Sequence, residues 1–190
     1  KALDMNEGST NNERVCLEDT FVNVAQKNNC KGAGDIFDDP VSVRTVSLWY
    51  KADDVDTRQV LFEEGGSTKG QIIHLLNGEI FACTTASDLG TCVSYTTTAN
   101  EWHHVALVWA GSETNGSHLY HDGEKVATFT GKDNVQHDDN SALGNIAQKT
   151  RMKQTDGSGT EQVTCSDCAS FAGIIDEFRV TDTELTSAEI

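Results

Sequence analysis

The sequence predicts an all-β domain built as an antiparallel β-sandwich, and three observations indicate this. Apolar residues recur with a period of two far more often than with the period of 3.6 typical of helices. Turn signals separate the apolar runs at regular intervals, and no long helical segment interrupts them. The runs expected to form strands are residues 21–25, 43–51, 59–63, 71–76, 79–83, 102–110, 118–121, 125–129 and 171–180.

Two of the turns are specific enough to predict hairpins. Asn77-Gly78 and Asp122-Gly123 are residue pairs that type I′ turns prefer, because both central positions need a positive φ. Near the C-terminus, residues 186–190 are expected to form one helical turn, with Thr186 or Ser187 as its cap.

Alternation along a strand also predicts which side chains share a face. One face of residues 102–109 carries Trp102, His104, Ala106 and Val108, and the other carries His103, Val105, Leu107 and Trp109. Both faces are largely apolar, so we expect loops to cover part of the outer face. In the last strand the same count places Asp176 on the core-facing side with Ile174, Phe178 and Val180. A carboxylate there needs a cation or backbone N–H groups as partner.

Length, composition and charge limit the function classes. The 190 residues suit one domain, spanning residues 1–190, with 37% apolar residues and a formal net charge of -16. This charge repels phosphate backbones and anionic lipid, so nucleic acid and membrane surfaces are not expected partners, and no apolar run is long enough for membrane insertion. Because the chain begins at Lys1 without a leader signature, we expect a module of a longer protein.

The six cysteines form three local pairs, which predicts a disulfide framework. The pairs are Cys16 with Cys30, Cys83 with Cys92, and Cys165 with Cys168. A bridge between the second pair would clamp the base of a hairpin, and closure of the first loop contributes ~3 kcal/mol in the chain-entropy model. The third pair is a Cys-x-x-Cys, which suits a redox dithiol, half of a zinc site or a small bridged loop. We favour the bridged loop, because the sequence has no second cysteine pair at the spacing that a zinc site needs. Three bridges imply the periplasm, the cell surface or the medium.

Three segments together resemble a known family. Residues 46–51 (VSLWYK), 101–109 (EWHHVALVW) with 119–123, and 171–180 (FAGIIDEFRV) with 184–190 are similar to laminin G-like, concanavalin A-like jelly-roll domains, to which pentraxins are related. The resemblance runs from about residue 2 to the end. It implies two curved antiparallel sheets of six or seven strands, and ligands bound at a loop rim or on the concave sheet.

The resemblance also implies calcium as a cofactor at the rim, where carboxylates and amides supply six to eight oxygens. The segment that matches the pentraxin calcium cluster keeps only Asn145 and Gln148 as oxygen donors, with Ile146 and Ala147 where acids are expected. A double calcium site is therefore not expected. The candidate ligands of a single calcium ion are Asn6, Glu7, Asp138, Asp139 and Asp176. The alternative is that these acids form a solvated face.

Residues 148–170 form a long polar stretch that we expect to be a functional loop, with a disordered insertion as the alternative. Together with the segment before it, this stretch supplies the predicted ligand-binding residues. They are Asn140, Asn145, Gln148, Arg151, Asp156, Glu161 and Asp167.

No catalytic or metal-binding histidine is expected. His103 and His104 are adjacent on a strand and so face apart, as do His118 and His121, and all six histidines are interpreted as ordinary. No Glu-x-Asp-x-Glu run or Gly-x-Ser-x-Gly elbow occurs. The one lyase-like segment, residues 71–74, turns His74 away from Gln71. Activity as an enzyme is therefore not expected.

Aromatic residues are candidate sugar platforms. Trp49, Tyr50, Trp102 and Trp109 occupy positions that the family uses for packing, so we expect them in the core, and we expect Tyr95 and Tyr120 to be exposed.

The sequence therefore predicts a non-catalytic extracellular recognition module of a larger secreted or surface protein, such as an adhesin, a pilus-associated protein or a polysaccharide-degrading enzyme. Its expected ligand is a glycan or glycosylated surface, bound with or without calcium. The alternative is a structural spacer or protein-interaction domain. Exposed aromatics beside the calcium candidates favour a glycan, whereas a smooth polar rim with an apolar side patch favours a protein.

Overall fold

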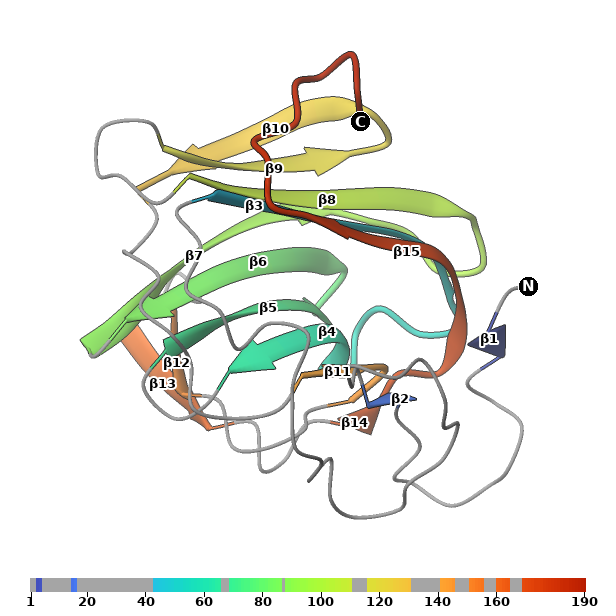
Figure 1. The fold of residues 1–190 in the computed structure, drawn as a ribbon. Helices are drawn as coiled ribbons and strands as arrows, with labels where there is room; N and C mark the ends of the chain where they lie inside the picture. The colour runs from blue at the N-terminus through green and yellow to red at the C-terminus, as the bar shows by residue number, and fades with distance from the viewer. Residues whose placement is uncertain are drawn as a thin grey trace.

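The computed structural model confirms the all-β architecture (Figure 1). It describes residues 3–4, 15–16, 43–65, 69–86, 88–110, 116–130, 141–145, 151–155, 160–164 and 169–190, and the structural statements below concern these residues. The strand expected at residues 21–25 lies outside them. In the described ranges, no helix has the length and apolarity needed to cross a bilayer.

Two sheets stack face to face as a sandwich, with sheet A uppermost in Figure 1. Sheet A has the order β1-β15-β3-β8-β9-β10, and all its neighbouring strands are antiparallel. Its strands are β1 (Leu3–Asp4), β3 (Val43–Ala52), β8 (His103–Ala110), β9 (Ser117–His121), β10 (Glu124–Phe129) and β15 (Gly173–Thr181).

Sheet B has the order β2-β11-β4-β5-β6-β7, and β14 pairs with β4 in parallel. Its strands are β2 (Val15–Cys16), β4 (Gln59–Gly65), β5 (Lys69–Leu76), β6 (Glu79–Ala86), β7 (Asp88–Thr96), β11 (Ala142–Leu143) and β14 (Ala169–Ser170). Within the stretch expected to be one long loop, β12 (Arg151–Thr155) and β13 (Thr160–Thr164) form a separate hairpin, and β12 lies beside β7.

Both predicted hairpins are confirmed. Asn77 and Gly78 connect β5 to β6 with φ values of 52° and 76°, and Asp122 and Gly123 connect β9 to β10 with φ values of 51° and 81°. These are the left-handed conformations that a type I′ turn requires, and they match the right-handed twist of the strands on either side.

The predicted disulfide between Cys83 and Cys92 is also confirmed. The two residues are register partners on β6 and β7, so the bond clamps this hairpin across the sheet. Cys16 contributes its backbone to β2, but its side chain, Cys30, Cys165 and Cys168 lie outside what the structure describes.

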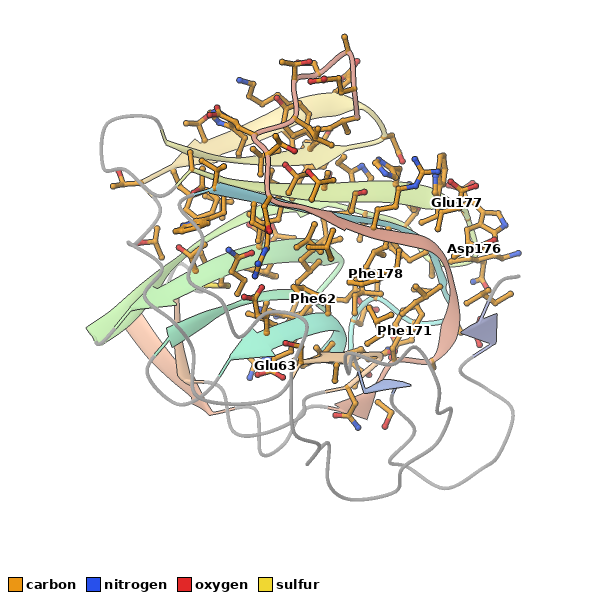
Figure 2. The ribbon with its side chains drawn as sticks, viewed as in Figure 1. Phe62, Glu63, Phe171, Asp176, Glu177 and Phe178 are labelled. Atoms are coloured by element: carbon orange, nitrogen blue, oxygen red, sulfur yellow. A yellow bond between two sulfur atoms is a disulfide. The ribbon has the colours of Figure 1, made fainter. Side chains whose placement is uncertain are left out.

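The main core fills the space between the sheets. It is formed mainly by buried residues of strands of both sheets, among them Val46, Leu48, Tyr50, Val105, Leu107, Leu61, Phe62, Ile73, Leu75, Ile80 and Ala82. Phe62 of β4 and Phe178 of β15 meet across it with their ring centroids 5.5 Å apart (Figure 2). Removal of this apolar surface from water is the main favourable contribution to folding.

A β-bulge in β15 changes which side chains face this core. Between Asp176 and Arg179 the register with β3 shifts by one extra residue, and Glu177 has a φ of 48°. The extra residue reverses the alternation, so Phe178 packs in the core while Asp176 pairs with Trp49 on the outer face. The expectation that Asp176 and Phe178 share the core-facing side was therefore wrong.

C-terminal residues cover part of the outer face of sheet A, as expected. Ile190 packs there against Ala106, Val108 and Tyr120. The predicted turn is present, because the backbone N–H of Ile190 donates to the Thr186 carbonyl at 3.2 Å. The Glu189 carboxylate accepts from the Thr186 N–H at 2.9 Å and from its hydroxyl at 2.8 Å, which confirms Thr186 as the cap.

A buried ion pair joins the two sheets near the start of β3. Arg44 Nη1 donates to Glu64 Oε1 of β4 at 2.7 Å, and both side chains are buried. Arg44 Nε also donates to the exposed Asp182 at 3.0 Å. Because a buried charge that loses its partner is costly, loss of either side chain destabilises the contact between the sheets at this end.

Gly173 is expected to be intolerant of any side chain. It has a φ of 147°, and a Cβ there meets the Lys51 carbonyl oxygen and lies 2.8 Å from Phe171 Cζ. Gly123→Ala is the matched control, because Gly123 also has a positive φ but has open space around it. We predict that urea unfolding gives a loss of about 1–2 kcal/mol for Gly123→Ala and at least about twice that for Gly173→Ala. Equal losses would contradict the close approach of β15 to β3.

His74 is the buried histidine of the second core, on the outer face of sheet B. That core contains Val60, Ile72, Phe81 and Cys83. The His74 ring stacks on Phe81 with centroids 4.9 Å apart and an interplanar angle of 4°. Burial lowers the pKa of His74 to about 4.

Stability is predicted to depend on pH through His74. The unfolded chain, in which the pKa of this histidine is about 6.5, binds a proton that the folded chain excludes. The stabilisation that comes from a neutral His74 in the folded state is therefore complete above pH 6.5, and it is lost as the pH falls toward 4. Between pH 7 and pH 5, wild type should lose about 2 kcal/mol more than His74→Gln in urea unfolding. Parallel losses in the two proteins would show that His74 is not held neutral.

Candidate functional site

The strand register of sheet A brings residues distant in sequence together on its outer face. Trp49 of β3 pairs with His104 of β8 on one side and with Asp176 of β15 on the other. The rings of Trp49 and His104 have centroids 5.2 Å apart. Trp102 comes two residues before His104, so the strand alternation places it on the same face.

These residues surround a hollow that is open to solvent. Its volume is about 290 Å³, and its lining residues are Trp49, Trp102, Asp176 and Glu177. Trp49 is 40% exposed and Trp102 is 44% exposed, which is unusual for such large apolar side chains. We call this feature the tryptophan hollow.

The bulge in β15 supplies the acidic side of the tryptophan hollow. Figure 2 shows Asp176 and Glu177 at the outer edge of the sandwich, while Phe178 of the same strand lies between the sheets. The Glu177 N–H donates to Asp176 Oδ1 at 2.9 Å, which orients that carboxylate. Arg179 Nη2 donates to Glu177 Oε2 at 2.7 Å, and both side chains are exposed.

The tryptophan hollow combines two kinds of recognition chemistry. The indole rings offer flat apolar surface, and the carboxylates are hydrogen-bond acceptors. Burial lowers the pKa of His104, although the negative charge of Asp122 acts in the opposite direction. The imidazole that contacts Trp49 is therefore neutral at neutral pH. The arrangement therefore suits a ligand with an apolar face and several hydrogen-bond donors.

Exposure of the aromatic residues differs in part from expectation. Tyr50 and Trp109 are buried and Tyr95 is 40% exposed, as expected. Trp49 and Trp102 were wrongly expected in the core. The apolar alternation that buries Val46, Leu48 and Tyr50 carries the signal that places Trp49 outside. Tyr120 was wrongly expected to be exposed, because Ile190 packs on it.

Of the predicted site residues, Asp176 lines the tryptophan hollow and Asn145 does not contribute an exposed group. Asn145 is buried, and its Nδ2 donates to Ser170 Oγ at 2.9 Å. Arg151 and Glu161 lie in the β12–β13 hairpin, of which the backbone is described. The remaining candidates, Asn6, Glu7, Asp138, Asp139, Asn140, Gln148, Asp156 and Asp167, lie outside the described residues.

Histidines that the sequence indicated to be ordinary meet an aspartate on the inner face of sheet A. His103 contacts Tyr50 while His104 contacts Trp49, so the predicted opposite orientations are confirmed. His103, His121 and Asp122 nevertheless converge, with candidate ligand atoms within 4.8 Å of one another. Register between β8 and β9 creates this cluster, which spacing along one strand does not indicate.

Asp122 and His121 of this cluster differ in charge at neutral pH. Burial lowers the pKa of His121, although Asp122 acts in the opposite direction. Burial also opposes ionisation of Asp122, but the polar contact with His103 and the hydrogen bond from the His104 N–H outweigh it and hold the pKa of Asp122 below its usual value. A charged carboxylate therefore faces the His121 imidazole, which is neutral at neutral pH.

Solved structures similar to this fold include carbohydrate-binding and laminin domains. The CBM40 domain of the Ruminococcus gnavus IT-sialidase, bound to α2,3 sialyllactose, has a TM-score of 0.56 at 19% identity, covering 79% of this chain and 81% of that one. A heptameric SAP-like pentraxin from Limulus polyphemus has a TM-score of 0.57 at 15% identity, covering 98% and 77%. Domains LG4-5 of the mouse laminin α1 chain have a TM-score of 0.59 at 14% identity, covering 94% and 42%. At these identities the likeness shows the fold.

Sequence comparison shows the family. No curated protein has a sequence that matches this chain significantly. The family model described as the concanavalin A-like lectin/glucanases superfamily matches residues 34–190, which is more than half of the chain. The predicted resemblance to laminin G-like domains and pentraxins is thereby confirmed. The chain belongs to the concanavalin A-like lectin/glucanase superfamily and has its jelly-roll fold.

Proposed function

We propose that this domain is a non-catalytic glycan-recognition module of a larger extracellular protein and that the tryptophan hollow binds the sugar. The observation that carries the proposal is the exposed pair Trp49 and Trp102 beside the carboxylates of Asp176 and Glu177. The apolar face of a pyranose ring stacks on an indole, and its hydroxyl groups donate to carboxylates. Together these contacts match the apolar face and the hydroxyl groups of a sugar ring.

The charge of the tryptophan hollow favours a neutral sugar. Two carboxylates line it, of which Glu177 is paired with Arg179 and Asp176 has no cationic partner among the described residues, and the whole chain carries a net charge of -16. An acidic sugar brought to this face meets repulsion from nearby charges and from the field of the protein. We therefore expect neutral oligosaccharides to bind in preference to sialylated ones, unlike the CBM40 domain described with sialyllactose.

Two further observations support recognition of glycan over a spacer role. Exposed aromatics lie beside Asp176, the calcium candidate whose side chain is described, which is the arrangement that favours a glycan. The large apolar side chains exposed in the described part of the chain are Trp49, Tyr95 and Trp102, and two of them belong to the tryptophan hollow rather than to a broad apolar patch. A protein interface usually needs such a patch.

An extracellular location is part of the proposal, supported by the disulfide between Cys83 and Cys92. The other predicted ligand-binding residues, which we call the loop rim, are proposed as a second surface that contacts longer glycans; they are Arg151 and Glu161 of the β12–β13 hairpin together with Asn140, Gln148, Asp156 and Asp167.

Truncation of either tryptophan is predicted to weaken glycan binding. A glycan array with neutral and sialylated oligosaccharides identifies a ligand, and calorimetry then measures its affinity for Trp49→Ala and Trp102→Ala. Each variant loses a stacking surface, so each should bind at least about tenfold more weakly, which corresponds to about 1.4 kcal/mol. Both tryptophans are partly exposed, so the melting temperature should change little.

Tyr95→Ala is the matched control, because Tyr95 is as exposed as Trp49 but lies on a different sheet. Its affinity for the glycan should equal that of wild type. Unchanged affinity in both tryptophan variants would move the site to the loop rim. Absence of binding to every glycan would reject the proposal and favour the spacer or protein-interaction alternative.

Calcium is proposed as an assisting cofactor, with Asp176 among its ligands. One oxygen of this carboxylate is held by the Glu177 N–H, and carboxylate oxygens are the ligands that calcium prefers. Millimolar calcium should raise the melting temperature by several degrees relative to EDTA, because it binds the native state, and equal magnesium should not. Asp176→Asn should abolish the increase. The same melting temperature in EDTA and calcium would exclude the cofactor.

A further inference from the structure

A second cluster of chemically competent side chains lies on the inner face of sheet A, where β8 begins and β9 ends. His103 and His121 have ring centroids 4.8 Å apart. Tyr95 of sheet B packs against His121 with centroids 5.3 Å apart, so this edge of the sandwich is closed by aromatic contacts. The tryptophan hollow lies on the opposite face of the same sheet, because consecutive residues of β8 point to opposite sides.

The Asp122-Gly123 turn fixes the position of the carboxylate in this cluster. Asp122 has a φ of 51°, its N–H donates to the His104 carbonyl at 2.8 Å, and its Oδ1 accepts from the His104 N–H at 2.8 Å. The other oxygen, Oδ2, then lies 2.8 Å from His103 Nδ1 and 3.4 Å from His121 Nδ1. Three potential ligand atoms thus point toward one place.

The hydrogen bonds of His103 indicate why a cation suits the position between His103 and Asp122. With the single proton of the Thr98 hydroxyl given to Glu101 Oε2 at 2.8 Å, Thr98 Oγ1 accepts from His103 Nε2 at 2.9 Å. A neutral imidazole with its proton on Nε2 has a lone pair at Nδ1, and this lone pair faces the Asp122 carboxylate. Either a second proton or a metal ion must lie between them.

His121 is held in a comparable way. Its Nε2 lies 3.2 Å from the Tyr50 hydroxyl, which in turn lies 2.6 Å from Thr97 Oγ1. With the tyrosine proton given to Thr97, the hydroxyl accepts from His121 Nε2 and leaves the Nδ1 lone pair free to coordinate. Histidine ligands of metals almost always donate their other ring N–H to such a partner, which fixes the tautomer and the ring.

We infer that His103 Nδ1, His121 Nδ1 and Asp122 Oδ2 form a binding site for a zinc-class divalent transition-metal ion. Two imidazole nitrogens and one carboxylate oxygen are a donor set for zinc, whereas calcium and magnesium prefer oxygen alone. Ligand atoms around tetrahedral zinc are separated by about 3.4 Å, from bond lengths near 2.1 Å. Asp122 Oδ2 lies 2.8 Å and 3.4 Å from the two Nδ1 atoms, and one candidate ligand atom of each residue lies within 4.8 Å of the others, so the observed separations are close to this spacing.

Three protein ligands leave one coordination position for water or for a group of another molecule. Access is available, because the Asp122 side chain is 46% exposed while the two imidazoles are mostly covered. The site is chemically and spatially separate from the calcium proposed at Asp176, since it uses nitrogen ligands on the inner face.

The test is zinc titration of the full chain after removal of metals by dialysis against EDTA. Calorimetry should give one zinc ion per chain with a dissociation constant on the order of micromolar or tighter, and zinc should raise the melting temperature. Asp122→Asn keeps a residue that favours the turn but removes the charge, and His103→Ala removes a ligand. Each should weaken zinc binding at least about tenfold and abolish the thermal shift.

His118→Ala is the matched control. His118 bonds Thr128 at 3.0 Å on the other side of β9, and this variant should bind zinc as wild type does. Nitrogen-15 NMR of the histidine rings should show coordination through Nδ1 with the proton on Nε2. Absence of zinc binding at millimolar metal, or equal affinity in wild type, Asp122→Asn and His103→Ala, would overturn the site. Glycan binding by Asp122→Asn should match wild type, which separates this site from the tryptophan hollow.

Discussion

Antiparallel pairing of β3 with β8 is the constraint on which the rest of the domain depends. The pairing is continuous from Val43 with Ala110 to Tyr50 with His103. In such a pair, alternate residues of both strands face the same side, so one register decides the content of both faces at once. The inner set builds the core and ends in Tyr50 and His103, while the outer set ends in Trp49 and His104. A slip of one residue exchanges these sets and destroys both the core and the tryptophan hollow.

Polar groups inside the sandwich are concentrated at its two ends. Arg44 pairs with Glu64 near the start of β3, and Tyr50 bonds Thr97 and lies next to His121 near its end. The middle of the strand contributes fully buried apolar residues. Buried polar groups are tolerated where they find hydrogen-bonding partners, so the polar contacts at the two ends flank a middle section that contributes apolar burial.

Local chemistry in the sequence was sufficient for the elements that depend on neighbours in the chain. Positive φ at Asn77-Gly78 and Asp122-Gly123, the disulfide between Cys83 and Cys92, and the cap at Thr186 each follow from residues less than a dozen positions apart. The ordered set of family segments predicted the two-sheet antiparallel sandwich but not the order of its strands.

Features that depend on strand register could not be predicted in this way. The bulge at Glu177 turns Asp176 outward, and no local pattern marks the extra residue. His103 and His121 come together through the pairing of β8 with β9, whereas residue spacing along one strand carries no information about the neighbouring strand. Exposure of Trp102 depends on how much of the outer face the C-terminal residues cover, which is a property of the assembled sheet.

The composition of the tryptophan hollow has a consequence for how the domain matures. Trp49 lies on β3, Trp102 immediately precedes β8 and Asp176 lies on β15. These three strands are neighbours in sheet A but far apart along the chain, and β15 is the last of them in sequence. During synthesis from the N-terminus, β3 and β8 can pair while the edge that β15 will occupy is still open. Long-range pairings of this kind form late and slowly. The tryptophan hollow is therefore incomplete until β15 has been synthesised and has joined the sheet, so the two tryptophans are exposed before the carboxylates of β15 lie beside them.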